Sequence, residues 1–308
     1  MIDTLSRVLV FFAFIAAGAI LVRFKRLDQA GLNGLSAYFY WLGFPAWLLV
    51  SFSQLPRFDS HMATALAAYI AAMIACAAIV VTAGLLLRQP KTAAVPAGMA
   101  SFINNSAFLG IPIAVSLFGP AAATSGPLVV ACDFLALFCL GCAALAKASG
   151  HTFKEALVHT ARNPTLIGAL LGLICLFAGI RLPIPVETAL EIMGKSGPPV
   201  ALVALGGMLG LMPARALLRI DTASALAIAA KILLAPALVA LVLTLIGVDP
   251  LFFKICVLLS ATPTAVSVFI QTKMYGTWYE GAATTVAQGT FISLFTLSAL
   301  ALVLTRIA

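Results

Sequence analysis

The chain has 308 residues, of which 63% are hydrophobic and 9% are charged. Soluble domains carry about 25% charged residues, so this composition excludes a soluble protein and predicts one integral membrane domain. The formal net charge is +8. The basic residues are scattered through short loops and form no stripe interleaved with aromatic residues, which excludes a nucleic-acid-binding surface.

Apolar runs follow one another along the whole chain. A helix needs about 20 apolar residues to cross ~30 Å of hydrocarbon. Short turns with proline, glycine or charged residues separate the runs. We therefore predict an all-α integral membrane fold with ten transmembrane helices, at roughly residues 4–22, 33–53, 61–87, 92–118, 121–146, 164–180, 186–212, 219–246, 250–274 and 278–304.

Basic residues between the runs predict the orientation of the chain. Arg23, Lys25 and Arg26 follow the first run instead of preceding it. This order is typical of a first span with its N-terminus outside, and not of a cleaved signal peptide. Alternating the loops from there puts eleven basic residues on the cytoplasmic side and five outside. We expect a multi-pass protein of the inner (plasma) membrane with both termini outside.

The longest polar segment, residues 148–163, lies at the centre of the chain. Charged and apolar residues alternate in it, which predicts a cytoplasmic linker with a short interfacial helix. It separates two units of five spans each, residues 1–147 and residues 164–308. Because each unit has an odd number of spans, the two insert with opposite orientation. This arrangement is typical of transporters built from inverted repeats.

Two polar, proline-containing stretches interrupt the runs at matching places in the two halves. The first covers residues 104–112 and begins with Asn104-Asn105-Ser106; the second covers residues 260–265 around Pro263. They fall in the fourth and ninth predicted spans. A broken transmembrane helix exposes backbone groups that hydrocarbon cannot satisfy, so such breaks persist where they line a cavity or a binding site. The pair predicts a secondary transporter with its substrate site at the breaks.

At these residues the chain resembles the auxin efflux carrier family of the bile acid/arsenite/riboflavin transporter superfamily. The family's fourth span carries an Asn followed by a Phe-x-Gly-x-Pro pattern, and its ninth span carries a break of small residues and proline followed by Tyr-Gly. The matching stretches are Asn105-Ser106-Ala107-Phe108-Leu109-Gly110-Ile111-Pro112, Ala261-Thr262-Pro263-Thr264-Ala265 and Tyr275-Gly276, with weaker similarity at Pro199-Val200-Ala201-Leu202, Gly206-Gly207, Lys231 and Pro236.

The resemblance covers the whole chain and implies a gradient-driven carrier of organic anions. Bacterial members are associated with malonate or malate, and plant members move auxin, an indole carboxylate. It further implies a scaffold made of spans one, two, six and seven. Spans three to five and eight to ten would form a mobile, elevator-like transport unit in which the broken spans cross. A homodimer through span six is an alternative to internal packing for its Gly168-x-x-x-Gly172 pattern.

Asn104 and Asn105 are the leading candidates for substrate contact. Each carboxamide offers two N–H donors, and the half-helix that follows presents free amides and a partial positive charge, both suited to a carboxylate. The alternative is that the asparagines only cap the broken backbone. Pro112 and Pro263 are interpreted as the residues that break the helices. The predicted substrate-binding set is Asn104, Asn105, Gly110, Ser260, Thr262, Thr264 and Gln288.

Asp133 and Lys231 are the candidates for ion coupling. Asp133 is the only acidic residue well inside a predicted span, where burial favours a protonated carboxyl group and gives it a task. It is either a proton carrier or the partner of a fixed ion pair or hydrogen bond. Lys231 is either that partner or a direct ligand of the anion. Lys195 either faces the cavity or extends outward. A sodium ion in place of the proton is the alternative coupling ion.

Other function classes have little support in the sequence. The six cysteines fall in apolar runs, and the Cys139-x-x-Cys142 pair lacks a second pair or a nearby histidine, so we predict no metal site and no cofactor. Signatures of intramembrane or serine hydrolases are missing, and we expect no enzymatic activity. A channel or a sensor built on the same helices remains the competing class.

Overall fold

The computed structural model describes residues 2–54, 60–150, 162, 164–212 and 220–306. In these ranges the chain is helical apart from short connections and one isolated β-bridge. The elements are α1 (Ile2–Arg23), α2 (Gln29–Tyr38), η1 (Phe39–Gly43), α3 (Phe44–Ser53), α4 (Ser60–Leu86), α5 (Lys91–Phe102), η2 (Ser106–Gly110), α6 (Ile111–Phe118), α7 (Pro120–Cys132), η3 (Asp133–Phe138), α8 (Cys139–Ala148), α10 (Pro164–Ala178), α11 (Ile184–Leu211), α13 (Thr222–Ala229), η4 (Ala230–Leu234), α14 (Ala235–Ile246), α15 (Pro250–Ser260), α16 (Val266–Met274) and α17 (Tyr279–Leu304).

Six helices among the described residues are long and apolar enough to cross a membrane, judged by length and composition. They are Gln29–Ser53, Ser60–Leu86, Pro120–Ala148, Ile184–Leu211, Thr222–Ile246 and Tyr279–Leu304. Shorter apolar helices cover Leu9–Arg23, Ser106–Phe118, Leu166–Ala178 and Pro250–Ser260. The all-helical membrane class is thereby confirmed. The count of ten spans and their inverted repetition stay predictions, because four of the predicted spans coincide with these shorter helices among the described residues.

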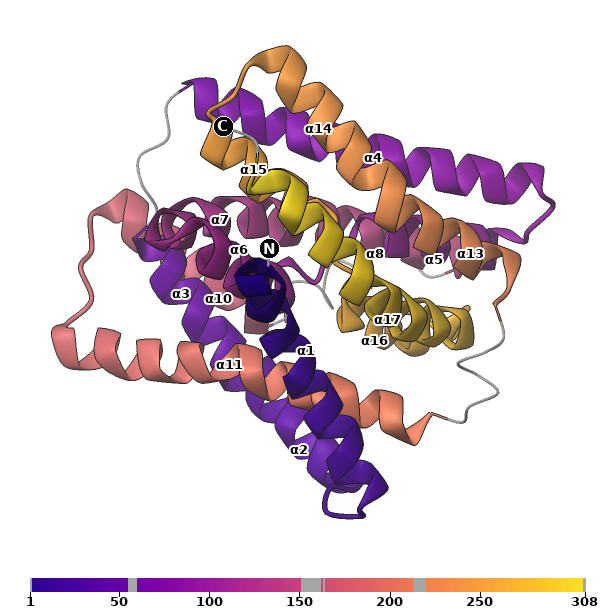
Figure 1. Cartoon of the computed structure of the whole chain (residues 1–308), viewed down its shortest axis with the longest axis horizontal. Coiled ribbons are helices and arrows are strands. Elements are labelled where there is room, and N and C mark those ends of the chain that lie inside the picture. The colour runs from indigo at the N-terminus through magenta and orange to yellow at the C-terminus, as the bar shows by residue number, and fades with distance from the viewer. Residues whose placement is uncertain (1, 55–59, 151–161, 163, 213–219, 307–308) are drawn as a thin grey trace.

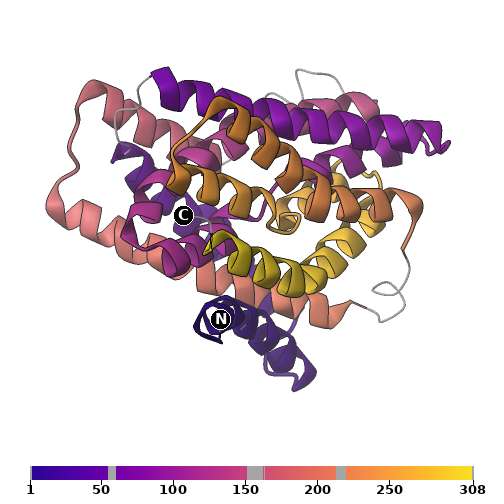
Figure 2. The ribbon, with the colours of Figure 1, turned by 45° about the horizontal axis from the view of Figure 1, so that its top comes forward.

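Helices α1, α2, α3, α10 and α11 pack together on one side of the molecule (Figures 1 and 2). Glycines bring their backbones into direct contact. A Cβ added to Gly206 of α11 would lie 1.7 Å from the carbonyl oxygen of Ile15, and one added to Gly168 of α10 would lie 2.5 Å from that of Pro45. Gly172 is equally close to Leu49. Any larger side chain would force these helices apart, so both glycines of the predicted pattern serve packing inside the chain.

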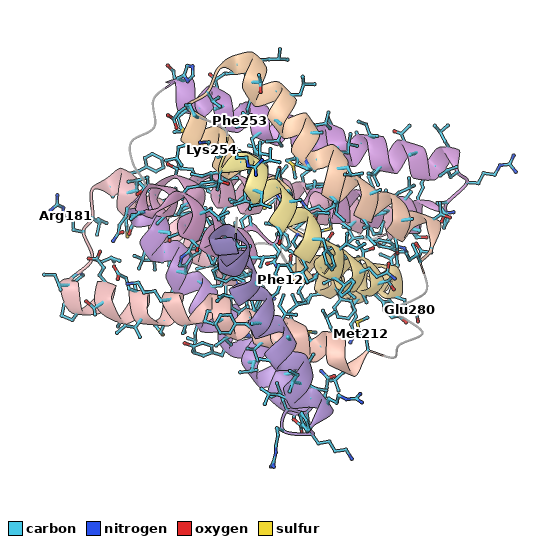
Figure 3. The ribbon with its side chains drawn as sticks, in the orientation of Figure 1. Phe12, Arg181, Met212, Phe253, Lys254 and Glu280 are labelled. Atoms are coloured by element: carbon cyan, nitrogen blue, oxygen red, sulfur yellow. The ribbon has the colours of Figure 1, made fainter. Side chains whose placement is uncertain are left out.

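The second group of helices lies against this first group. Helix α4 packs on α5 and α14, and α13 packs on α5 and α17. Figures 1 and 2 show α4 and α14 side by side, on the side of the molecule away from α1 and α11. Figure 3 shows Arg181, in the turn after α10, pointing outward at one end of the molecule, with Glu280 at the other end. The predicted linker helix lies mostly outside the described residues.

The two polar stretches interrupt their helices and pair with each other. Helix α5 ends at Phe102 and η2 begins at Ser106, whereas α15 ends at Ser260 and α16 begins at Val266. The intervening backbones form an antiparallel bridge between Asn104 and Thr264. The amide of Asn105 donates to the carbonyl of Pro263 over 2.9 Å, and the amide of Ala265 donates to that of Ile103 over 3.1 Å. Each break therefore satisfies backbone groups that the other leaves open, which hydrocarbon could not do.

Four widened, π-helical turns surround these breaks: η1, η2, η3 and η4. Three of them are followed within two residues by a proline, namely Pro45, Pro112 and Pro236. Proline lacks an amide hydrogen and its ring clashes with the carbonyl four residues before it, so the preceding turn widens. Segment η3 has no such proline after it. Because π-helical turns in proteins concentrate at functional sites, their grouping here marks the region of the breaks.

Candidate functional site

A cavity of about 320 Å³ lies where the first break faces the α2–α11 side of the molecule. Its walls come from α2 and η1, the two breaks, η3, α11 and α16. No lysine, arginine, aspartate or glutamate is among the lining residues that the structure describes. The cavity is therefore an uncharged space between the two helix groups.

Aromatic rings form much of its wall. Phe108, which follows the first break, packs edge-on against Phe39 and Phe44 of the other helix group, with ring centroids 4.3 Å and 4.6 Å apart. Phe134 of η3 lies 4.9 Å from Phe44. Such pairs stabilise one another beyond the area they bury. They give the cavity a large apolar face that is contributed by both helix groups.

Two carboxamides contribute to the polar part of the wall. Asn105 and Gln271 line the cavity with exposed fractions of 4% and 8%. Within the described part of the chain, neither side chain makes a hydrogen bond, and Asn105 does not cap the helix that it precedes. Buried polar groups are normally paired, so these two are available to a ligand. The capping alternative is therefore not supported for Asn105.

Two half-helices begin at the cavity. Ala107 and Phe108 in the first turn of the Ser106–Phe118 helix line it, and so do Val266 and Ser267 in the first turn of α16. First-turn amides have no acceptor within their own helix, and the helix dipole places a partial positive charge there. Both half-helices therefore place a partial positive charge at the wall of the uncharged cavity, the first of them directly after Asn105.

Asn104 also lines the cavity, but its carboxamide is fully used by other residues. Lys231 donates to its Oδ1 atom and also, over 2.7 Å, to the carbonyl of Ser260. The Nδ2 atom of Asn104 donates to the hydroxyl oxygen of Tyr69 at 2.8 Å and to both Asp133 oxygens at 3.1 Å and 3.2 Å. Lysine has no acceptor, so the amide oxygen must face it and the NH₂ group must face Asp133. Asn104 thus bridges the two predicted coupling residues.

The Asp133 carboxylate is buried and surrounded by donors. The Tyr69 hydroxyl donates to Oδ1 over 2.8 Å, and the Ser106 hydroxyl donates to Oδ2 over 2.6 Å. With Asn104, these bonds fill the acceptor sites of an ionised carboxylate. The ion pairs found among the described residues do not include a direct one between Asp133 and Lys231. The expected pair is therefore a charge pair joined through Asn104.

Several predicted site residues lie outside the cavity wall. The Ser260 hydroxyl donates to the carbonyl of Val257 over 2.8 Å, and the Thr262 hydroxyl donates to that of Leu259 over 2.7 Å. The Thr264 hydroxyl donates to the carbonyl of Ala100 over 2.7 Å. These hydroxyls satisfy backbone groups next to the second break.

The other predicted residues also lie outside the cavity wall. A Cβ at Gly110 would lie 3.1 Å from Leu259 and Thr262, so this glycine allows the two breaks to approach each other. Pro112 is the second residue of α6, and the carbonyl of Pro263 accepts the backbone bond described above. Gln288 lies on α17, away from the cavity. Lys195 is exposed and pairs with Glu191 at 2.6 Å, so it extends outward.

Tyr69 and Ser106 were not predicted. A tyrosine in the middle of the apolar α4 sequence indicates a polar contact inside the protein, because a buried phenolic hydroxyl needs a polar partner. Ser106 follows Asn105 directly and begins the second half of the broken helix. No group of three potential metal-binding side chains occurs among the described residues.

Comparison with known proteins fits these features. Residues 150–301 match the family model described as "Membrane transport protein". The chain is 28% identical to a protein of Rhizobium meliloti (strain 1021) named "Putative malonate transporter", in an alignment that covers 97% of this chain and 95% of the relative. The family and the relative are transporters and not enzymes. The chain is thus a helical, multi-pass membrane protein that is similar to a transporter over nearly its whole length and matches the family model over just under half of it.

Proposed function

We propose that this protein carries small organic anions across the plasma membrane by alternating access, with the cavity as the substrate site. The anions are carboxylates, a class that includes malonate, malate and auxin-like acids. One observation carries the proposal: two half-helix N-termini and two unpaired, buried carboxamides open onto an otherwise uncharged cavity. The name of the malonate-transporter relative agrees with this class.

A carboxylate would bind where the half-helix that follows Asn105 meets the cavity. The first-turn amides of Ala107 and Phe108 and the Nδ2 group of Asn105 are donors there, and Gln271 offers a second carboxamide. The aromatic wall would contact the rest of the molecule. A water molecule's share of liquid volume is ~30 Å³, so a cavity of about 320 Å³ has room for an acid with an apolar or aromatic body.

The moving parts would be the two helix groups. Helices α1, α2, α3, α10 and α11 correspond to the expected scaffold, and their glycine contacts favour one rigid body. The expected transport unit contains both breaks and lies on the other side of the cavity. An elevator-like shift of this unit would carry the substrate. The paired breaks also support the proposed ten spans in two inverted repeats.

Coupling to a proton is the second part of the proposal. Asp133 is buried, and the hydroxyls of Ser106 and Tyr69 beside it can either donate or accept a hydrogen bond. The carboxyl group could therefore gain and lose a proton without leaving an unpaired polar atom. Sodium coupling is the alternative to a proton.

The test is substrate binding by purified Asn105→Ala protein, screened against mono- and dicarboxylates by thermal shift and then titrated calorimetrically. Loss of one hydrogen bond to a charged group costs roughly 1.5–3 kcal/mol, so affinity should fall about 10- to 150-fold. Asn33→Ala is the matched control, because Asn33 is an exposed residue of α2 whose side chain accepts a hydrogen bond from exposed Gln29. Unchanged affinity in a folded Asn105→Ala protein would remove the cavity as the site.

A counterflow experiment separates a carrier from a channel. Liposomes preloaded with unlabelled malonate should take up labelled malonate faster than empty ones if the protein exchanges substrate. A channel does not need preloading, so equal uptake rates would refute alternating access.

A further inference from the structure

We infer that protonation of Asp133 and binding of the anion favour each other, so that one proton crosses the membrane together with each singly charged carboxylate. The inference rests on the proposed function of the cavity, and it specifies the direction of coupling. A proton that competed with the anion would instead give exchange of the two.

The first step is that both negative charges use the same helix end. Ser106 is the first residue of η2, and its hydroxyl donates to Asp133 over 2.6 Å. Its neighbours Asn105 and Ala107 line the cavity. An ionised Asp133 and a bound carboxylate would therefore lie on either side of one half-helix N-terminus. Like charges at one site oppose each other, so protonating Asp133 raises the affinity for the anion.

The second step is that the cluster tolerates both protonation states. An ionised Asp133 accepts from Tyr69, Asn104 and Ser106. A protonated carboxyl group must donate one hydrogen bond instead. The NH₂ group of Asn104 cannot accept it, because the oxygen of that amide is held by Lys231. The hydroxyls of Tyr69 and Ser106 can accept it, so the proton has a partner on either side.

The third step is charge balance. The titratable groups around Asp133 are Tyr69 of α4, Lys231 of η4, the adjacent Cys132, and Cys256 of α15. Cys76 of α4 lies beside Lys231. A phenol and thiols are neutral near pH 7, so Asp133 and Lys231 set the charge of the cluster. Their charges cancel in the empty carrier. They cancel again when a proton on Asp133 accompanies a monoanion bound in the cavity.

A bound anion without the proton would leave one net negative charge among buried groups. Net charge is costly in hydrocarbon, so the two neutral states are those that can cross. A carrier that moves only in these states carries one proton per monocarboxylate and no net charge. The Asn104 bridge, which contacts both charges and the cavity wall, is the physical link between the proton site and the substrate site.

The experiment titrates purified full-length protein with phenylacetate, a monoanion with an apolar ring, and with malonate, from pH 5.5 to 8. For phenylacetate we expect affinity to rise as the pH falls, by up to about tenfold per pH unit, because one proton is linked to binding. In weakly buffered solution a pH indicator should report uptake of about one proton per phenylacetate bound. Proton release, or affinity that rises with pH, would overturn the inference and leave the substrate site standing.

Three variants assign the linkage to Asp133. In Asp133→Asn the affinity for phenylacetate should lose its pH dependence and match the low-pH value of the parent. Asp28→Asn is the control, since asparagine also caps α2 and should keep the parent's pH slope. Ser106→Ala should flatten the pH profile, and Ser106→Thr should restore it. A full pH slope in folded Asp133→Asn would refute the role of Asp133. Absence of binding by both phenylacetate and malonate would overturn the proposed function itself.

Discussion

Replacement of Lys231 by methionine tests the buried charge pair most directly. Lys231 is 1% exposed and donates to Asn104 and to the carbonyl of Ser260. Methionine has a similar length and no donor, so the variant leaves both acceptors and the Asp133 charge without compensation. Breaking a buried pair by removing one partner costs about 3–5 kcal/mol. Since proteins are stable by only about 5–15 kcal/mol, we expect a clearly lower melting temperature at pH 7.

The pH dependence of this variant has a definite sign. Once Lys231 is gone, protonation of Asp133 removes the uncompensated charge, so the folded state binds more protons than the unfolded state. Stability of Lys231→Met should therefore rise as the pH falls from 7 toward 5, relative to the parent. The double variant Lys231→Met/Asp133→Asn should recover part of the loss at pH 7. Thermal unfolding in detergent measures all three proteins. A single variant as stable as the parent at pH 7, with no gain from the second change, would refute the charge pair.

Three further predictions concern other parts of the molecule. Gly206→Val should push α1 away from α11, because the added Cβ would lie 1.7 Å from the carbonyl oxygen of Ile15. We expect this variant to fold poorly and to lose its monodisperse peak on size-exclusion chromatography. Gly34→Val is the control and should fold normally, because the space around Gly34 is open. Tyr69→Phe removes a hydroxyl that bonds Asp133 and Asn104, and should lower unfolding stability by about 1–3 kcal/mol; an unchanged melting temperature would contradict the hydrogen bonds. A periplasmic reporter fused after Ala308 should be active, and activity of a cytoplasmic reporter there would refute an even number of spans with the N-terminus outside.

The breaks themselves were predictable from the sequence. Prolines and polar residues inside apolar runs have few uses in a membrane, so Pro112, Pro263 and the Asn104-Asn105 pair marked the right positions. Pro45, Pro112 and Pro236 also indicate the widened turns that precede them. Lone buried charges such as Asp133 and Lys231 pointed to each other because each needs compensation.

The contacts between segments were not predictable. Lys231 meets Asn104 across 127 residues of sequence, and Tyr69 meets Asp133 across 64. One sequence does not reveal which polar residues of different helices come together. Nor does it distinguish a hydroxyl that faces a cavity from one that bonds a carbonyl of its own or a neighbouring helix. For that reason Thr262 and Thr264 were expected at the substrate site and instead stabilise the backbone.

The adjacent asparagines of the first break explain how two sites can act together. Residue 104 forms an isolated antiparallel bridge with Thr264, and its side chain and that of Asn105 have different surroundings. The Asn104 amide is held between Lys231 and Asp133, whereas the side chain of Asn105 lines the cavity and makes no hydrogen bond to the residues that the structure describes. One peptide bond joins the two residues, so a shift of the backbone at one of them moves the other. Because the next residue, Ser106, both bonds Asp133 and starts the half-helix facing the anion, the same short segment responds to proton and substrate. A helix that ran unbroken through these residues would use its amides internally, and it could not offer them to a substrate.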